Sequence, residues 1–187
     1  MPLRLTVFFG LMWLVAAKAG EPIDGRTAGK WIAHPEWAPG KASSSYSVGD
    51  SDGVLAFVCS GGVMTWTFDP AAVHLAGGKR YLLLRYRAEG VVSTGDYLLL
   101  ARDGSPDWRH YLTQRDLIPD GAEHTLAVDL LSFLPPGNLE QFAVRISSAP
   151  GQTARLVARL EFANELPDGT RAAGAPAGDR KTARMDL

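Results

Sequence analysis

Residues 141–162 read QFAVRISSAPGQTARLVARLEF, and apolar and polar side chains alternate through most of this segment. In its first part, Phe142, Val144 and Ile146 fall on one side of an extended chain. In its second part, every other residue from Leu156 to Phe162 is apolar. A period of two residues is typical of a β-strand with one face in a core and one in solvent. The segment therefore predicts strands of antiparallel sheets that are packed on a shared core.

Similar runs with β-branched or aromatic residues precede this segment at short spacing, separated by Gly, Pro, Asp and Asn. The further expected strands, including a polar edge strand at the start, are 43–48, 54–59, 63–68, 81–88, 97–101, 109–113 and 125–130. The glycine-bearing turn Ser60-Gly61-Gly62 predicts a hairpin between the second and third of these. No segment of ten residues has a helical period, and the best candidate, 129–134, is stopped by Pro135. The pattern predicts an all-β fold, an antiparallel β-sandwich or jelly roll of eight or nine strands.

Composition limits the class of protein. The 187 residues are 46% hydrophobic and 21% charged, which is ordinary for a globular chain and suggests one domain. The 19 basic and 20 acidic residues leave no basic excess, which argues against a nucleic-acid partner. The single cysteine, Cys59, excludes a disulfide framework or a cysteine-rich zinc site within this chain. It lies in an apolar run, and we expect it to be buried.

The first 19 residues predict a signal peptide. Arg4 gives a positive start, residues 7–17 are apolar except for Gly10, and Ala17-Lys18-Ala19 matches a cleavage site. The alternative is a single membrane anchor, but the apolar run is well short of the ~20 residues that span a bilayer. We therefore expect cleavage after Ala19, no membrane span, and a secreted or periplasmic protein.

The remaining chain is divided by composition. We expect an N-terminal extension at 20–42, the β-sandwich at 43–166, and a disordered tail or linker at 167–187, which is rich in Gly, Ala, Pro and charge. Residues 21–166 carry 13 basic and 17 acidic residues, a net charge of −4, which argues further against nucleic acid. Trp31 and Trp37 in the extension are expected to cover an open sheet edge.

From Tyr81 onward the chain resembles a known group of domains. The segments that carry the resemblance are YLLLRYRAEG (81–90), DYLLLARDG (96–104), DLIPDGAEHTLAVDL (116–130) and the 141–162 strands. They resemble galactose-binding-like jelly-roll domains, which include many carbohydrate-binding modules of secreted bacterial proteins. In these domains a D-G-x-x-H-T-L pattern forms a turn and the start of a strand, and a last strand ends in a phenylalanine. The residues of this chain at those positions are Asp120, Gly121, His124, Thr125, Leu126 and, in the last strand, Phe162. The resemblance covers about residues 45–164 and implies a non-catalytic module that holds a glycan, with a structural calcium in some members.

The predicted ligand residues lie around one turn. Trp108 follows Pro106-Asp107 at an expected sheet rim, where an aromatic ring can serve as a platform for a sugar. Arg109 and Tyr111 are expected on one face of the next strand, and Tyr97 on the preceding strand extends that surface. The alternative, that Trp108 turns inward and caps the core, has equal weight. Trp66 alternates with Met64 and Phe68 and is expected in the core.

Two charged features have alternative interpretations. Five arginines are expected on outward strand faces: Arg85, Arg87, Arg145, Arg155 and Arg159. A cationic stripe suits an acidic polysaccharide, but solvated faces with cross-strand ion pairs are favoured because Glu89 and Glu161 interrupt it. Asp50 and Asp52, joined by Glu161, form a candidate metal site, yet calcium takes about 6–8 oxygen ligands. A plain Asp-Gly turn is favoured, so no cofactor is expected, with structural calcium as the alternative.

Motifs of enzymes are absent from the sequence. It has no G-x-S-x-G, H-E-x-x-H, P-loop or dinucleotide fingerprint, and its four histidines are scattered. We therefore expect no catalytic residues. The sequence favours an exported carbohydrate-binding module whose partner is a polysaccharide or other glycan. The alternative is a structural or protein-interaction domain of the cell envelope with a protein partner. A glycoside hydrolase or lyase is a distant third possibility, since it needs two carboxylates about 5–9.5 Å apart.

Overall fold

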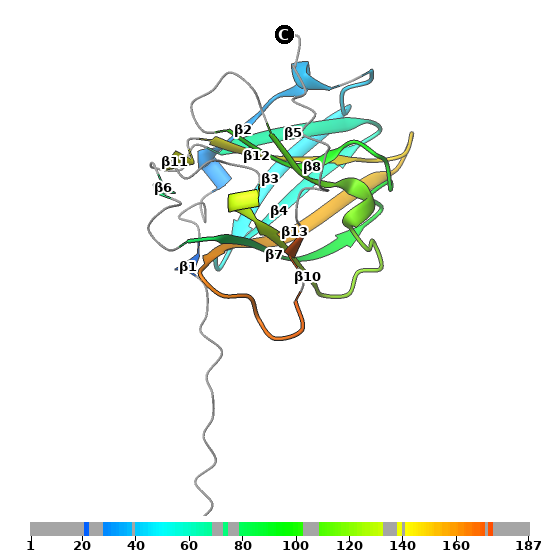
Figure 1. The fold of residues 1–187 in the computed structure, drawn as a ribbon. Helices are drawn as coiled ribbons and strands as arrows, with labels where there is room; N and C mark the ends of the chain where they lie inside the picture. The colour runs from blue at the N-terminus through cyan, green and yellow to red at the C-terminus, as the bar shows by residue number, and fades with distance from the viewer. Residues whose placement is uncertain are drawn as a thin grey trace, which may run out of the picture.

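A computed structural model describes residues 21–22, 28–38, 40–68, 73–74, 79–102, 109–132, 138–139, 141–170 and 172–173. These residues form two β-sheets that lie face to face (Figure 1). Within the described ranges the only helices are short 3-10 turns, namely η1 (Ala28–Lys30), η2 (Pro35–Trp37), η4 (Gln114–Asp116) and η5 (Leu130–Ser132). None of the described helices is long and apolar enough to cross a membrane.

The larger sheet has seven strands. They are β1 (Glu21–Pro22), β3 (Ser45–Ser51), β4 (Val54–Ser60), β7 (Tyr81–Glu89), β10 (His124–Asp129), β13 (Thr153–Ala163) and β14 (Ala172–Ala173). Their order is β14-β10-β7-β13-β4-β3, and β1 also pairs with β13. All of these pairs are antiparallel except β10 with β14. The long central strand β13 therefore connects both halves of this sheet.

The smaller sheet has five strands in the order β2-β5-β12-β8-β9. They are β2 (Trp31–Ala33), β5 (Val63–Phe68), β8 (Tyr97–Arg102), β9 (Arg109–Thr113) and β12 (Gln141–Ser147). A separate pair is formed by β6 (Val73–His74) and β11 (Asn138–Leu139). Nine of the described strands have five or more residues. The predicted all-β antiparallel sandwich is confirmed; the predicted strands correspond to these nine longer ones, and the short β1, β2 and β14 are additional members of the two sheets.

The core confirms the period-two pattern. The inward residues of β12 and β13, from Phe142 to Ile146 and from Leu156 to Phe162, are buried between the sheets. Trp66 is fully buried as predicted. The ring of Trp31 lies 4.9 Å from that of Phe57 and 5.5 Å from that of Phe142, so it fills the space between the two sheets.

The turn at Ser60-Gly61-Gly62 is not a hairpin, and that prediction is wrong. Strand β4 pairs with β3 and β13, whereas β5 pairs with β2 and β12 in the other sheet. The turn is a corner at which the chain crosses between sheets. A Cβ atom at Gly62 would lie 2.5 Å from the carbonyl oxygen of Lys41, so only glycine allows this close backbone approach.

The sandwich also includes strands from both flanking segments. Trp31 lies in β2 and belongs to the core rather than to a cover outside it. At the other end, Ala172 packs in a small apolar cluster with Leu83 and Ala127. The predicted signal peptide, 1–19, and residues 174–187 of the predicted tail lie outside the described residues, so those expectations stay predictions.

The Asp-Gly turn of the resemblance is held by its own side chains. The Asp120 carboxylate accepts hydrogen bonds from the backbone N–H of Ala122 at 2.8 Å and from the His124 ring at 2.9 Å. The His124 bond lowers the pKa of Asp120. Gly121 has a φ of 77° and its N–H donates to the carbonyl of Ala88. These contacts give His124 a structural role.

Gly90, directly after β7, provides a test of the packing at the sheet end. Its φ is 63°, and a Cβ atom there would lie 2.3 Å from the carbonyl oxygen of Thr153. We expect Gly90→Ala to lower the free energy of unfolding by about 2–4 kcal/mol because strain and a backbone clash combine. Gly151 is the matched control, since its φ is 73° but nothing lies within 4 Å of its Cβ position. Gly151→Ala should cost about 1 kcal/mol in urea unfolding; equal losses would contradict the clash.

Cys59 provides a test of core closure. Its thiol is buried and contacts the carbonyl oxygens of Gly62 and Ile146, each at 3.7 Å. Burial raises its pKa to about 11. The thiol therefore stays protonated at about pH 8, where an ordinary exposed cysteine is partly thiolate. We expect no reaction with a disulfide reagent in native buffer and one equivalent in guanidinium chloride. Rapid labelling of the folded protein would contradict this burial.

Candidate functional site

In the described part of the chain, the outer face of the five-stranded sheet is covered along β5, β8 and β12. Outward residues of β5 and β12 such as Thr65, Thr67 and Ala143 are buried. Trp37 and Tyr97 pack against Leu100 and Ala143 on this face. The N-terminal segment that carries Trp37 therefore closes a sheet face rather than only a sheet edge.

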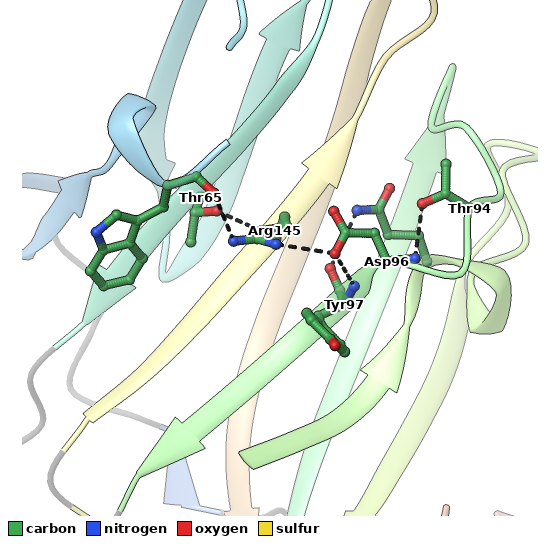
Figure 2. A network of polar contacts seen from close by, with 7 residues as sticks. Thr65, Thr94, Asp96, Tyr97 and Arg145 are labelled. Atoms are coloured by element: carbon green, nitrogen blue, oxygen red, sulfur yellow. Dashed lines mark hydrogen bonds and ion pairs between the residues drawn. The ribbon is translucent and has the colours of Figure 1, made fainter. Parts of the chain in front are cut away.

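Arg145 lies at the centre of a network of polar contacts on this face (Figure 2). Its side chain donates to Thr65 Oγ1 at 2.7 Å, to Asp96 Oδ1 at 3.0 Å and to the carbonyl oxygen of Trp37 at 3.1 Å. Only 3% of the residue is exposed. The prediction that Arg145 stands on a solvated face is wrong. Alternation correctly predicts that its side chain points away from the sandwich core. The N-terminal segment with Trp37 then covers this outer position and excludes solvent from it.

His34 fastens the same segment to β5. Its ring stacks on that of Trp37, with the ring centroids 3.9 Å apart. Its Nε2 is hydrogen-bonded to Thr67 Oγ1 at 2.9 Å, and its Nδ1 to the Glu36 carboxylate at 2.7 Å. The bond from His34 lowers the pKa of Glu36. These ring, backbone and carboxylate contacts hold the N-terminal segment against β5.

The predicted ligand residues are only partly described. Trp108 lies outside the described residues, as do the side chains of Arg109 and Tyr111, whose backbones belong to β9. Tyr97 is half-buried, and burial raises its pKa. The Trp108 surface therefore stays a prediction.

Strand β9 is not regular, which affects that prediction. Leu112 pairs with Leu99 and His110 with Leu100, so two steps along β9 match one step along β8. Such a β-bulge breaks the alternation of faces. The side chains of Arg109 and Tyr111 lie outside the described residues, so the common face expected for them stays a prediction.

The outer face of the seven-stranded sheet contains a groove with a volume of about 520 Å³. We call it the sheet groove. It is lined by Val54, Arg85, Tyr86, Arg87, Glu123, Val157, Arg159 and Glu161. These residues come from β4, β7 and β13 and from the position before β10. The central strands therefore present a concave surface with charged walls and two valines.

The charged residues of the sheet groove are partly paired. Arg85 Nε lies 3.4 Å from Glu161 Oε2, and Arg87 lies 3.5 Å from the Glu123 carboxylate. Arg159 contacts the carbonyl oxygen of Asp52 at 3.5 Å. The ion pairs of Arg85 and Arg87 confirm, for these two residues, the interpretation that the outward arginines form cross-strand pairs.

Glu161 is the unusual member of the sheet groove. Its side chain is only 8% exposed, whereas that of Arg85 is 40% exposed. Both Glu161 Oε2 and Arg85 Nε are buried atoms without a hydrogen-bond partner, because their mutual orientation does not make a hydrogen bond. The two charges are therefore paired at 3.4 Å, but this buried contact is an ion pair without a hydrogen bond.

The structure does not bring the candidate metal ligands together. Asp50 and Asp52 lie at the β3–β4 turn, where Asp52 has a φ of 51°, while Glu161 faces Arg85 on β13. In the described part of the chain, no three His, Cys, Asp or Glu side chains gather closely enough to hold a metal ion. The Asp50 to Gly53 segment is thus an Asp-Gly turn between two strands, and the calcium alternative gains no ligand set here.

Sequence reasoning missed the groove as a site. Alternation in the sequence predicts outward positions for Arg85, Arg159 and Glu161. It does not predict that Val54, Glu123 and Val157 lie beside them. The signal that the sequence offers is alternation: Val157, Arg159 and Glu161 take every second position on β13, between residues of the core. Which residues of β7 lie opposite them depends on the strand register, which one sequence does not reveal.

Comparisons with known proteins give similar sandwiches at low sequence identity. No protein-family model and no curated protein match the chain. Among solved structures, the N-terminal cellulose-binding domain of Cellulomonas fimi β-1,4-glucanase C matches 79% of this chain and 99% of its own, at 15% identity and a TM-score of 0.46. A family 11 carbohydrate-binding module of Clostridium thermocellum, in complex with a mixed-linked tetrasaccharide, matches 79% and 98% at 13% identity and a TM-score of 0.49. Similarity at this level carries no inference about what this chain binds.

Arg145 gives a test of the covered face. Replacing it by Met leaves Asp96 and the Trp37 carbonyl without their buried donor, so we expect a loss of about 2–4 kcal/mol in the free energy of unfolding. Arg155, an exposed arginine on the neighbouring sheet, is the matched control. Arg155→Met should change stability by less than about 0.5 kcal/mol. Similar values for both variants in urea unfolding would show that Arg145 is solvated.

Proposed function

We propose that this chain is an exported, non-catalytic carbohydrate-binding module and that the sheet groove is its ligand site. The observation that carries the proposal is the groove itself, whose lining combines three guanidinium groups, two carboxylates and two valines. A sugar hydroxyl both donates and accepts, so it suits a lining that offers both guanidinium donors and carboxylate acceptors. Charged partners make such hydrogen bonds stronger than neutral ones.

The rest of the groove fits a saccharide. Val54 and Val157 supply apolar area for the C–H faces of a sugar ring, while Arg87 and Glu123 offer a further donor and acceptor. Tyr86 is not a stacking platform, since it is 2% exposed and its hydroxyl accepts the N–H of Ile118 at 3.0 Å. We therefore expect recognition through hydrogen bonds more than through aromatic stacking.

Two further arguments support a binding role outside the cell. Both carboxylates of the groove face arginines, an arrangement suited to holding hydroxyls rather than to proton transfer. The predicted signal peptide and the resemblance of residues 45–164 to galactose-binding-like domains favour a secreted or periplasmic glycan binder.

Binding to soluble polysaccharides tests this function. The chain without its predicted signal peptide, residues 20–187, is run in affinity gels that contain neutral and acidic polysaccharides, with titration calorimetry for those that retard it. We expect Glu161→Gln to weaken binding about tenfold or more, because the Arg85 guanidinium loses the carboxylate that positions it in the groove. Glu89→Gln is the control, since Glu89 is exposed on β7 and does not line the groove.

Trp108→Ala separates the two candidate surfaces. If the sheet groove binds the glycan, this variant retains affinity. Loss of binding in Trp108→Ala together with full binding in Glu161→Gln would assign the ligand to the rim predicted from the sequence. Absence of any saccharide binding, with a stable protein partner in its place, would overturn the proposed function.

A further inference from the structure

We propose that the saccharide held by the sheet groove is acidic and that Arg159, with Arg85 beside it, binds its carboxylate or sulfate group. The inference rests on the proposed function and names its ligand class. It starts from the register of the two central strands, in which Arg159 lies directly opposite Arg85. Both residues line the groove.

Two like charges directly opposite each other destabilise a sheet. Such a pair is expected where another interaction compensates for it. Arg85 has a partial compensation from Glu161 at 3.4 Å, and Arg87 has one from Glu123 at 3.5 Å. For Arg159, the contact found among the described residues is the carbonyl oxygen of Asp52 at 3.5 Å, the limit of a hydrogen bond.

The charges of the groove are therefore unequal. Three guanidinium groups, those of Arg85, Arg87 and Arg159, line it together with two carboxylates, those of Glu123 and Glu161. The excess positive charge is centred on Arg85 and Arg159, which lie opposite each other. A planar carboxylate or a sulfate matches the fork of donors on a guanidinium, and its negative charge relieves the repulsion between the two arginines.

The position of Glu161 sets how such a ligand lies. It follows Arg159 by two residues on β13, so both point to the same face about 6.6–6.8 Å apart along the strand. That spacing is comparable to the size of one sugar ring. A hydroxyl of the ring lies beside the more exposed Arg85, while the acidic group reaches Arg159 and stays away from the Glu161 carboxylate.

Recognition of this kind is local. Residues 21–166 have a net charge of −4, so the domain as a whole does not attract polyanions. The expected ligand is therefore an acidic saccharide that fits the groove, not any polymer of high negative charge. Double-stranded DNA serves as the control polyanion and should not bind.

The test compares an acidic saccharide with its neutralised form. The chain of residues 20–187 is titrated with oligogalacturonates and with the same oligosaccharides after methyl esterification, which removes the charge but keeps the sugar. Alginate oligosaccharides and sulfated carrageenan oligosaccharides extend the panel and distinguish a carboxylate from a sulfate. We expect at least one acidic ligand to bind about tenfold more tightly than the neutral ligands, which include the methyl esters and a β-glucan oligosaccharide.

Variants assign the preference to the groove. Arg159→Gln should remove the difference between acidic and neutral ligands, whereas Arg155→Gln, on the same strand but outside the groove lining, should keep it. Arg159→Gln should also leave the melting temperature unchanged or raise it, because it removes the like-charge opposition. This second measurement shows that the variant folds.

The outcomes separate this inference from the proposed function. If neutral glycans bind as well as acidic ones and Glu161→Gln abolishes that binding, the acidic ligand is wrong and the carbohydrate-binding function stands. An acidic preference that survives Arg159→Gln, or equal binding of DNA, overturns the role of Arg159. If none of the saccharides, acidic or neutral, binds, both proposals fail.

Discussion

The buried guanidinium of Arg145 governs which surface of this sandwich is open. Its donors reach oxygen atoms of three segments: Thr65 on β5, Asp96 before β8 and the carbonyl of Trp37 in the N-terminal segment. A buried charge is tolerated only when it is paired and hydrogen-bonded, so the N-terminal segment cannot leave without a large cost. The outer face of the five-stranded sheet is thereby covered along β5 and β12, while the seven-stranded sheet has a groove on its outer face beside the small apolar cluster of Leu83 and Ala127.

Arginine has two different physical roles on the two sheets. On β12, Arg145 is enclosed and fully engaged, and it acts as a connector between segments. On β7 and β13, Arg85 and Arg159 lie opposite each other at a concave surface with fewer carboxylates than guanidinium groups. The first arrangement stabilises the fold, while the second leaves hydrogen-bonding and electrostatic capacity for a ligand. The proposed carbohydrate site follows from this difference.

Much of the fold was predictable from local pattern. The nine longer strands, the core positions of Trp66 and Phe142 and the buried Cys59 follow from a period of two residues, because alternation reports directly which side chains share a face. The crossing at Gly62 was not predictable, since a short glycine turn suits a hairpin and a corner equally well. The groove was not predictable either, because the opposition of Arg85 and Arg159 depends on register between strands distant in sequence.

The sequence alone thus determined that this is an all-β sandwich, which residues form its core, and which polar residues lie on the outer faces of its sheets. Only the tertiary structure decided which of these outer faces is closed and which is open. Alternation along a strand shows which side chains point into the core and which point away from it. It cannot show whether an outward side chain meets solvent or a covering segment. That choice depends on a contact between Arg145 and Trp37, which are 108 residues apart in the chain and meet only when the sandwich is assembled.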